Sequence, residues 1–204
     1  LPRTLSALAD QTRPVDRAIG VDTSSRDDSL RHLTNAFGAD QVTSYRAHRG
    51  GLGAALKAGL ASLAPSGGNT AGEWIWLLHD DSAPDPRALA ELLTAVELAP
   101  SVTVAGCKQL DWDSNRHLID VGLSISRWAE RLTLIEPEEL DQGQYDGRSD
   151  TFAVNSAGML IRRDVWELLG GFDPALPGTG DDVDFCWRNR LAGNRVVVVP
   201  TAKI

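Results

Sequence analysis

Gly170-Gly-Phe-Asp-Pro174 is followed, after a short loop, by Gly180-Asp-Asp-Val-Asp-Phe-Cys-Trp-Arg188. The second stretch predicts a helix whose first turn contains Asp181, Asp182 and Asp184. The positive end of a helix stabilises carboxylates in their charged form. An ionised carboxylate beside a flexible loop suits a general base or a ligand for a cation. The alternative is that these acids only cap the helix.

A second acidic cluster lies upstream, where the apolar run that starts at Trp74 ends in His79, Asp80 and Asp81. A short hydrophobic run of this kind predicts a strand that is buried on both faces of a parallel sheet. Ligands of open α/β sheets bind beyond the carboxyl ends of such strands, so both carboxylates are expected at a cleft. Two adjacent carboxylates favour a cation such as Mg²⁺, although turn-forming Asp residues before Pro84 are the alternative.

In the rest of the chain, segments with the hydrophobic pattern of a strand alternate with segments with the pattern of a helix. This alternation predicts a largely parallel sheet with helices on both faces. Strands are expected over residues 17–22, 41–45, 74–78, 101–106 and 195–200. Helices are expected over residues 2–11, 30–37 and 52–63, and from residue 181 onward. A further helix is expected to have Asp85 as its N-cap and Pro86 at its first position, with Leu92 on its buried face.

The alternation stops between residues 108 and 150. Short antiparallel strands and a mobile loop over residues 141–147 are expected there, and the segment is a candidate for acceptor recognition. A solvated connection is an equally good interpretation. Trp128 is assigned to no site, and Trp187 is expected in the core because it follows a helical apolar pattern.

Composition narrows the classes of function. The chain has 204 residues, a length that is ordinary for one soluble domain. Its formal net charge of -8 argues against a nucleic-acid surface. A phosphate-bearing ligand would therefore need local groups and a cation to offset the acidic residues. Cys107 and Cys186 are too few for a disulfide framework and are expected as small buried hydrophobes. No stretch approaches the roughly 20 apolar residues that a membrane span needs.

Several motifs occur together in one order along the chain. They are Val21-Asp-Thr-Ser-Ser-Arg-Asp27, Arg49-Gly-Gly-Leu-Gly-Ala54, His79-Asp-Asp81, Gly158-Met-Leu-Ile-Arg-Arg163, Gly170-Gly-Phe-Asp173 and Asp181-Asp182. None is decisive alone, but the collinear set resembles family 2 glycosyltransferases over nearly the whole chain.

The resemblance implies the GT-A fold, a Rossmann-like, mostly parallel α/β sheet with helices on both faces and a small antiparallel region. It implies one domain over residues 1–204, with a nucleotide-binding part at about 1–107 and an acceptor and catalytic part at about 108–204. The implied activity is inverting transfer of a sugar from a nucleotide-sugar, most simply a UDP-sugar, to a carbohydrate or lipid-linked hydroxyl acceptor in cell-envelope or polysaccharide synthesis.

The resemblance also assigns roles to single residues. Asp182 matches the catalytic base, and Asp81 matches the ligand of a Mg²⁺ or Mn²⁺ ion. Asp22, Arg49 and Asp80 match positions that bind the nucleotide. Asp181 and Asp184 would be supporting acids, and Asp27 matches a downstream acid of the first motif, although Asp22 and Asp27 would otherwise be interpreted as turn or cap residues.

Two departures from the family pattern bear on these roles. His79 replaces an Asp that is common in the acidic triplet, and a lone His is more often a hydrogen-bonded structural residue than a metal ligand. The first strand of the family and a metal-binding histidine expected beyond Ile204 are not in the sequence, so we expect a fragment of a larger bacterial protein. The implied location is the cytoplasm, at the cytoplasmic face of a membrane if residues outside the chain attach it there.

Two other functions stay open at this point. A sugar-nucleotide nucleotidyltransferase uses a related sheet, but it would normally show a Gly-rich basic loop near its N-terminus. A non-catalytic carbohydrate-binding or scaffolding domain with the same fold is the other alternative, and the presence of both Asp81 and Asp182 argues against it.

Overall fold

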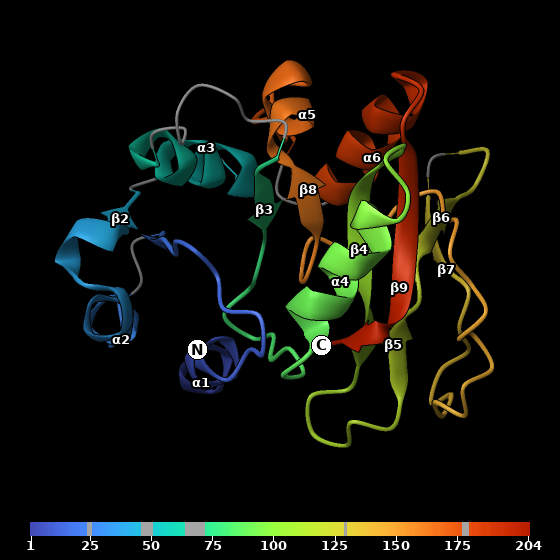
Figure 1. Ribbon diagram of the computed structural model, residues 1–204, viewed down its shortest axis with the longest axis horizontal. Coiled ribbons are helices and arrows are strands. Elements are labelled where there is room, and N and C mark those ends of the chain that lie inside the picture. The colour runs from blue at the N-terminus through green and yellow to red at the C-terminus, as the bar shows by residue number, and fades with distance from the viewer. Residues whose placement is uncertain (24–25, 46–50, 64–71, 129, 177–179) are drawn as a thin grey trace.

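A five-stranded sheet forms the centre of the protein, as the computed structural model shows for residues 1–23, 26–45, 51–63, 72–128, 130–176 and 180–204 (Figure 1). Four strands follow one another in the order β3-β8-β4-β5, and the fifth strand, β9, also pairs with β4. The strands are β3 (Trp74–Trp76), β8 (Leu160–Arg162), β4 (Val102–Leu110), β5 (Leu118–Asp120) and β9 (Arg195–Lys203).

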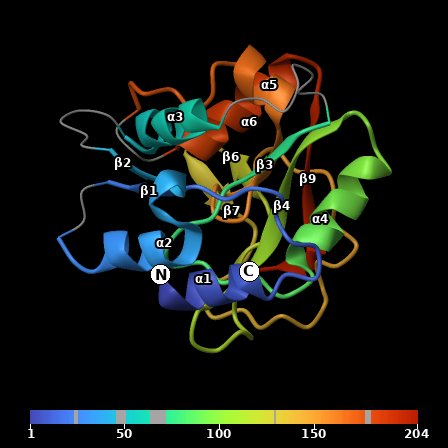
Figure 2. The same cartoon turned by 60° about the vertical axis from the view of Figure 1, so that its left-hand side comes forward.

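Helices cover both faces of the two long strands β4 and β9. Helix α4 (Ala88–Glu97) and helix α6 (Asp181–Leu191) lie on opposite sides of them (Figure 2). Side chains on a strand alternate between its faces, and β9 follows this rule. Val196 and Val198 join the core cluster that contains Phe185 of α6, whereas Val197 joins the cluster that contains Leu92 of α4. This double burial explains the run of four consecutive valines.

A smaller parallel sheet lies beside the central one and consists of β1 (Gly20–Asp22) and β2 (Val42–Ser44). Helix α2 (Ser29–Phe37), the short helix η1 (Ala39–Gln41) and helix α3 (Leu52–Ser62) connect or cover these strands. Helix α3 packs closely on β1, because a Cβ atom built on Gly59 would lie 2.5 Å from Cγ2 of Val21.

The expected antiparallel region is present between residues 108 and 150. It contains β5 and the hairpin of β6 (Leu123–Ile125) and β7 (Arg131–Thr133). Parallel pairing is confirmed for β1 with β2 and for β4 with β9. The other described pairs, β3 with β8, β4 with β8, β4 with β5 and β6 with β7, are antiparallel.

Strand β3 differs from the expectation of a strand buried on both faces of a parallel sheet. It runs antiparallel to β8, and its residues Trp74, Ile75 and Trp76 are only half-buried. The segment nevertheless continues into the core, since Leu77 is buried and its amide donates to the carbonyl of Met159 at 2.8 Å.

The turn after helix α5 (Arg163–Leu168) depends on two consecutive glycines. Gly170 and Gly171 have φ angles of 77° and 72°, a left-handed region that favours glycine. A Cβ atom on Gly171 would also lie 2.8 Å from the ring of Trp166. The turn delivers Phe172 into the core, where its ring lies 5.0 Å from that of Trp166 in an edge-to-face arrangement.

Arg188 of α6 fastens this turn to the helix that follows it. Its guanidinium donates to the carbonyls of Leu169 at 2.7 Å and Gly171 at 2.9 Å. The same guanidinium pairs with Asp184, four residues earlier, at 2.6 Å. The position of the α6 N-terminus is therefore tied to the Gly-Gly-Phe-Asp turn.

The predicted start of α4 was wrong by two residues, because the helix begins at Ala88 and not at Pro86. Gln11, which follows helix α1 (Pro2–Ala9), accounts for the difference. Its Oε1 accepts from the amide of Leu89 at 3.1 Å, and its Nε2 donates to the carbonyl of Asp85 at 2.8 Å. A side chain distant in sequence therefore satisfies a first-turn amide, and Asp85 stays outside the helix.

Trp187 is a second correction. It is 42% exposed and is not a core residue, and its ring packs against Phe152 with the centroids 6.0 Å apart. Cys107 and Cys186 are both buried and unpaired, as expected, and burial raises the pKa of each thiol to about 12.

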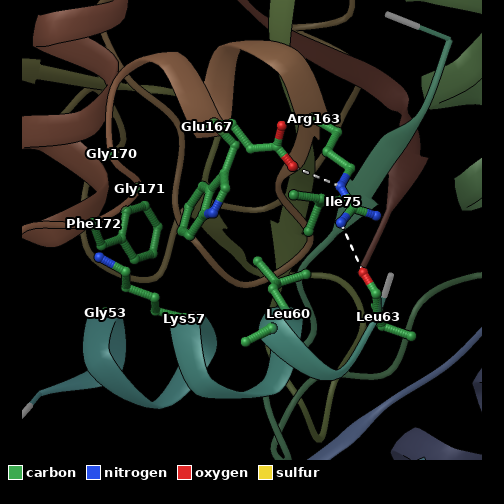
Figure 3. A pocket seen from close by; sticks show the side chains of 12 residues that line it. Gly53, Lys57, Leu60, Leu63, Ile75, Arg163, Glu167, Gly170, Gly171 and Phe172 are labelled. Carbon is green, nitrogen blue, oxygen red and sulfur yellow. Dashed lines mark hydrogen bonds and ion pairs between the residues drawn. The ribbon is translucent and has the colours of Figure 1, made fainter. Parts of the chain in front are cut away.

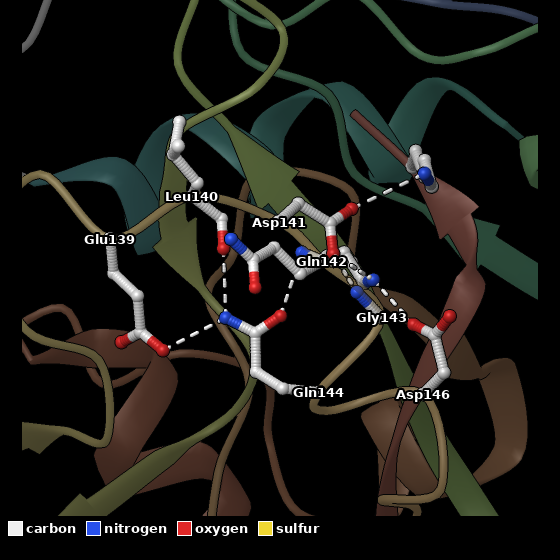
Figure 4. Close-up of polar contacts among 9 residues, drawn as sticks. Glu139, Leu140, Asp141, Gln142, Gly143, Gln144 and Asp146 are labelled. Atoms are coloured by element: carbon white, nitrogen blue, oxygen red, sulfur yellow. Dashed lines mark hydrogen bonds and ion pairs between the residues drawn. The ribbon is translucent and has the colours of Figure 1, made fainter.

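The loop over residues 141–147, which we expected to be mobile, is anchored by Lys108 of β4. Figure 4 shows two carboxylates of this loop, Asp141 and Asp146, with their polar contacts. The Lys108 side chain is 1% exposed, and its Nζ lies 2.9 Å from Asp141 and 2.5 Å from Asp146. Lys203 of β9 adds a contact of 3.3 Å to Asp141. A buried ammonium needs such partners, so this ion-pair group holds the loop against the sheet.

Candidate active site

The first predicted cluster, His79, Asp80 and Asp81, forms a tight turn beyond β3. The amide of His79 donates to Oγ of Ser82 at 3.0 Å, and the Ser82 hydroxyl donates to the carbonyl of His79 at 2.7 Å. Nε2 of His79 lies 3.1 Å from Oγ of Ser156. The structural alternative for His79 is therefore observed: its ring joins the turn to the segment before β8.

Asp80 and Asp81 are both exposed at this turn. Helix α1 holds the main chain of this turn in place, because Oγ1 of Thr4 donates to the carbonyl of Asp80 at 2.8 Å. No group of three or more His, Cys, Asp or Glu side chains able to hold a metal ion occurs in the described residues. Two adjacent carboxylates still fit Mg²⁺ or Mn²⁺, because such ions are often held by one or two carboxylates plus substrate phosphates.

The second predicted cluster lies in the first turn of α6, as expected. Its three acids have different surroundings. Asp184 is engaged by Arg188 at 2.6 Å, so it has a structural partner within the helix. Asp181 is 5% exposed, and Oδ1 of this residue is buried without a hydrogen bond from any described residue. Burial, followed by the charges of Asp182, Asp184 and Asp173, raises the pKa of Asp181.

Asp182 has the geometry that a proton acceptor needs. Asp182 is 5% exposed, and its Oδ1 accepts the amide hydrogen of Val183 at 2.8 Å. Oδ2 lies 3.7 Å from Nη1 of Arg131, beyond the usual hydrogen-bond distance. One oxygen of the base candidate is thus held by the helix, while the other faces an Arg without a short contact.

Asp120, at the end of β5, is a further buried carboxylate beside this pair. Its side chain is 3% exposed, and Oδ2 lies 3.6 Å from Nη2 of Arg131. Burial raises the pKa of Asp120 to about 6, an effect that Asp182 adds to and that Arg131 and the amide of Gly122 oppose. Asp120, Arg131 and Asp182 therefore form one electrostatic group, which we call the base triad.

A short stretch of chain joins the two acidic clusters. Val154 lies in the same buried core cluster as Cys186, which is one turn after Asp182 on α6. Two residues later, Ser156 contacts His79. Two residues of extended chain span at most about 7 Å, so residues 154–156 connect the neighbourhood of α6 with the turn at His79.

The three remaining predicted positions have different outcomes. Asp22 is 7% exposed at the end of β1, and its carbonyl accepts from the amide of Tyr45 at 2.7 Å. Asp27 accepts from the amide of Ser29 at 2.9 Å, two residues on, so the turn alternative is observed there. Arg49 lies outside the described residues.

A cavity of about 410 Å³ lies elsewhere, between α3 and α5 (Figure 3). Arg163 lines it, but the guanidinium of this residue is occupied by Glu73 at 2.9 Å and Glu167 at 3.0 Å. None of the predicted site residues is among the described residues that line this cavity. The acidic clusters remain the better candidate for chemistry, because they combine exposed and buried carboxylates at strand and helix ends.

Comparison with known proteins identifies the class. The family profile described as glycosyltransferase like family 2 matches residues 1–204, and the chain therefore belongs to this family. The O-antigen biosynthesis protein RfbC of Myxococcus xanthus is 29% identical over 137 residues, which are 65% of this chain and 11% of that protein.

Solved structures agree on the fold. GalNAc-T7 with UDP, GalNAc and Mn²⁺ gives a TM-score of 0.71 at 15% identity, covering 98% of this chain and 39% of that one. The mannosyltransferase PcManGT from Pyrobaculum calidifontis, in complex with GDP-Man and Mn²⁺, gives 0.65 at 18% identity, covering 98% and 51%. The GT-A fold expected from the sequence is confirmed, and the chain spans about half or less of each of these relatives. In the described part of the chain, no helix has both the length and the apolar character of a membrane span.

Sequence reasoning missed Asp120, Arg131 and Ser156. A weak signal for Asp120 was available, since an acidic residue ends a short apolar stretch two residues before Gly122. No signal marked Arg131, because its role depends on the pairing of β6 with β7.

Proposed function

We propose that this domain transfers a sugar from a nucleotide-sugar, most simply a UDP-sugar, to a hydroxyl acceptor with inversion at the anomeric carbon. The observation that carries the proposal is the connection of two acidic clusters through residues 154–156. One cluster contains a buried Asp182 whose Oδ2 lies 3.7 Å from Arg131 without a short contact, and the other presents the exposed pair Asp80 and Asp81. Family membership supports the same reaction class.

Asp182 acts as the general base in this proposal. The amide of Val183 holds Oδ1, which leaves Oδ2 to accept the proton of the acceptor hydroxyl. The acceptor oxygen forms its bond to the anomeric carbon as the bond from that carbon to the diphosphate oxygen breaks. The bonding electrons leave with the nucleoside diphosphate, and attack from the opposite side inverts the configuration.

Asp81, with Asp80 beside it, is the proposed ligand for Mg²⁺ or Mn²⁺. When bound, such an ion offsets the negative charge of a diphosphate. The exposure of both carboxylates supports this role, because a diphosphate must approach them from solvent. Asp22 and Arg49 are the proposed contacts to the nucleotide, on the basis of the family motif.

The nucleotide and acceptor classes are proposed from the relatives. GalNAc-T7 is described with UDP and Mn²⁺, and PcManGT with GDP-Man and Mn²⁺. The name of RfbC refers to O-antigen biosynthesis, which supports a role in cell-envelope polysaccharide synthesis at the cytoplasmic face of a membrane. We propose residues 108–150 for acceptor recognition, with the loop at residues 141–147 held by Lys108.

The proposal is tested by incubating the chain with a panel of UDP- and GDP-sugars, Mn²⁺ or Mg²⁺, and simple sugar acceptors. Release of nucleoside diphosphate that depends on both metal and acceptor is expected, and NMR of the product should show inversion. Release of pyrophosphate from a nucleoside triphosphate and a sugar phosphate would instead indicate a nucleotidyltransferase. Binding of nucleotide without turnover across the panel would indicate a non-catalytic domain.

A further inference from the structure

Arg131 opens strand β7 and reaches two carboxylates that come from different elements. Nη2 lies 3.6 Å from Oδ2 of Asp120 on β5, and Nη1 lies 3.7 Å from Oδ2 of Asp182 on α6. Ordinary N–H···O hydrogen bonds are about 2.7–3.2 Å long, so the guanidinium is shared between the two acids without closing on either. The Arg side chain is 43% exposed, whereas the carboxylate side chains are 3% and 6% exposed.

The orientation of Asp120 is fixed by its own backbone. Oδ1 accepts the amide hydrogen of Gly122 at 2.6 Å. Gly122 has a φ angle of 98°, and a Cβ atom there would lie 2.6 Å from Oγ1 of Thr151, so the turn requires glycine. Oδ2 of Asp120 is buried and has no hydrogen bond from the described residues. An oriented, buried carboxylate oxygen without a donor is costly and needs an explanation.

We propose that Asp120 and Arg131 are positioning residues for the base: Asp120 holds the guanidinium back, so that Arg131 stabilises ionised Asp182 without covering its proton-accepting oxygen. This inference rests on the proposed function, because it takes Asp182 as the base. It adds two positioning residues beside the base.

The charge balance of the base triad explains why both residues are needed. With Arg131 present, two carboxylates share one positive charge. Without it, two buried like charges would face each other, with Asp181 adding a third on the same helix turn, and one of them would take up a proton. Without the Asp120 charge, the guanidinium would be free to close on Asp182 as a short ion pair, which weakens the base.

The two cases predict opposite changes in the pH–rate profile. In Arg131→Gln, the acidic limb of kcat should move to higher pH by about one unit, with the KM of the donor within about twofold of the wild-type value. In Arg131→Lys, the limb should return most of the way toward the wild-type position. In Asp120→Asn, kcat should fall by about tenfold, with the limb moved to lower pH. Arg87→Gln is the matched control, since it removes an exposed Arg with a 3.5 Å ion pair to Glu91.

A measurement that needs no turnover separates this inference from the proposed function. The Asp120 carboxyl can be titrated by ¹³C NMR in the wild-type chain, in Arg131→Gln and in Arg87→Gln. We expect its titration to move to higher pH only in Arg131→Gln. If it moves but no donor is turned over by the wild-type chain, the coupled triad stands and the proposed function fails. If the titration and the acidic limb in Arg131→Gln match those of Arg87→Gln, the inference is wrong.

Discussion

Replacing Asp120 by Asn should change how the stability of the protein depends on pH. Burial raises the pKa of Asp120 from an ordinary value of 3.8 to about 6, so the folded protein binds this proton more tightly than the unfolded chain does. Between these two values the native state therefore holds more protons, and the free energy of unfolding falls as pH rises. The penalty is absent below the unfolded value and complete above the folded value.

The size of the effect follows from the shift. A shift of about two units corresponds to about 3 kcal/mol, of which about 2 kcal/mol should be lost between pH 4 and pH 7. Asn cannot ionise, so the variant lacks this loss. Its new amide faces Arg131 in place of Oδ2 and adds an unfavourable contribution, but that contribution does not vary with pH.

The assay is urea unfolding of the wild-type chain and of Asp120→Asn at several pH values from 4 to 7. The difference in the free energy of unfolding, variant minus wild type, should increase by about 2 kcal/mol over this range. Asp16→Asn is the control, because that side chain is 85% exposed and its substitution should give a nearly flat difference. A flat difference for Asp120→Asn as well would refute the claim that Asp120 is a strained, buried acid.

Two further predictions concern the nucleotide site and the Gly-Gly turn. In calorimetry, UDP should bind with Mn²⁺ or Mg²⁺ and at least tenfold more weakly with chelator, because without the metal its phosphates would face two carboxylates. Asp81→Asn should lower metal-dependent binding and turnover together. Equal affinity in chelator would contradict the role of Asp81. Gly171→Ala should lower the free energy of unfolding by about 2–4 kcal/mol, since a Cβ atom would lie 2.8 Å from the Trp166 ring at a left-handed φ angle. Gly170→Ala shares the φ strain but meets no atom within 4 Å, so a smaller loss of about 1 kcal/mol is expected; equal losses would show that the ring contact is unimportant.

The parts of the fold that local sequence determines could be predicted. The acids after Gly180 mark the start of a helix, and α6 begins at Asp181 as expected. The valine run of β9 likewise predicts a strand with both faces buried, because no polar residue interrupts it. These features depend on backbone preference and on hydrophobic period, which are visible in a short window of sequence.

The features that depend on distant partners could not be predicted. The amide of Leu89, in the first turn of α4, donates to the side chain of Gln11. The loop at residues 141–147 is held by Lys108. Both contacts join segments that are far apart in the chain. The base triad is of the same kind, since Arg131 meets Asp182 only because a hairpin of the irregular segment lies beside α6. Motif matching selected Asp182 but gave no information about the charges around it.

The most direct test of the proposed reaction compares sugar transfer with nucleotide binding in Asp182→Asn. The substitution keeps the size of the side chain and the hydrogen bond to the amide of Val183, but it removes the proton acceptor. We predict that transfer falls by about 10²–10⁴-fold while metal-dependent UDP affinity changes little. Near-normal transfer in this variant, with activity abolished instead in Asp181→Asn or Asp184→Asn, would contradict the assignment of Asp182 as the base.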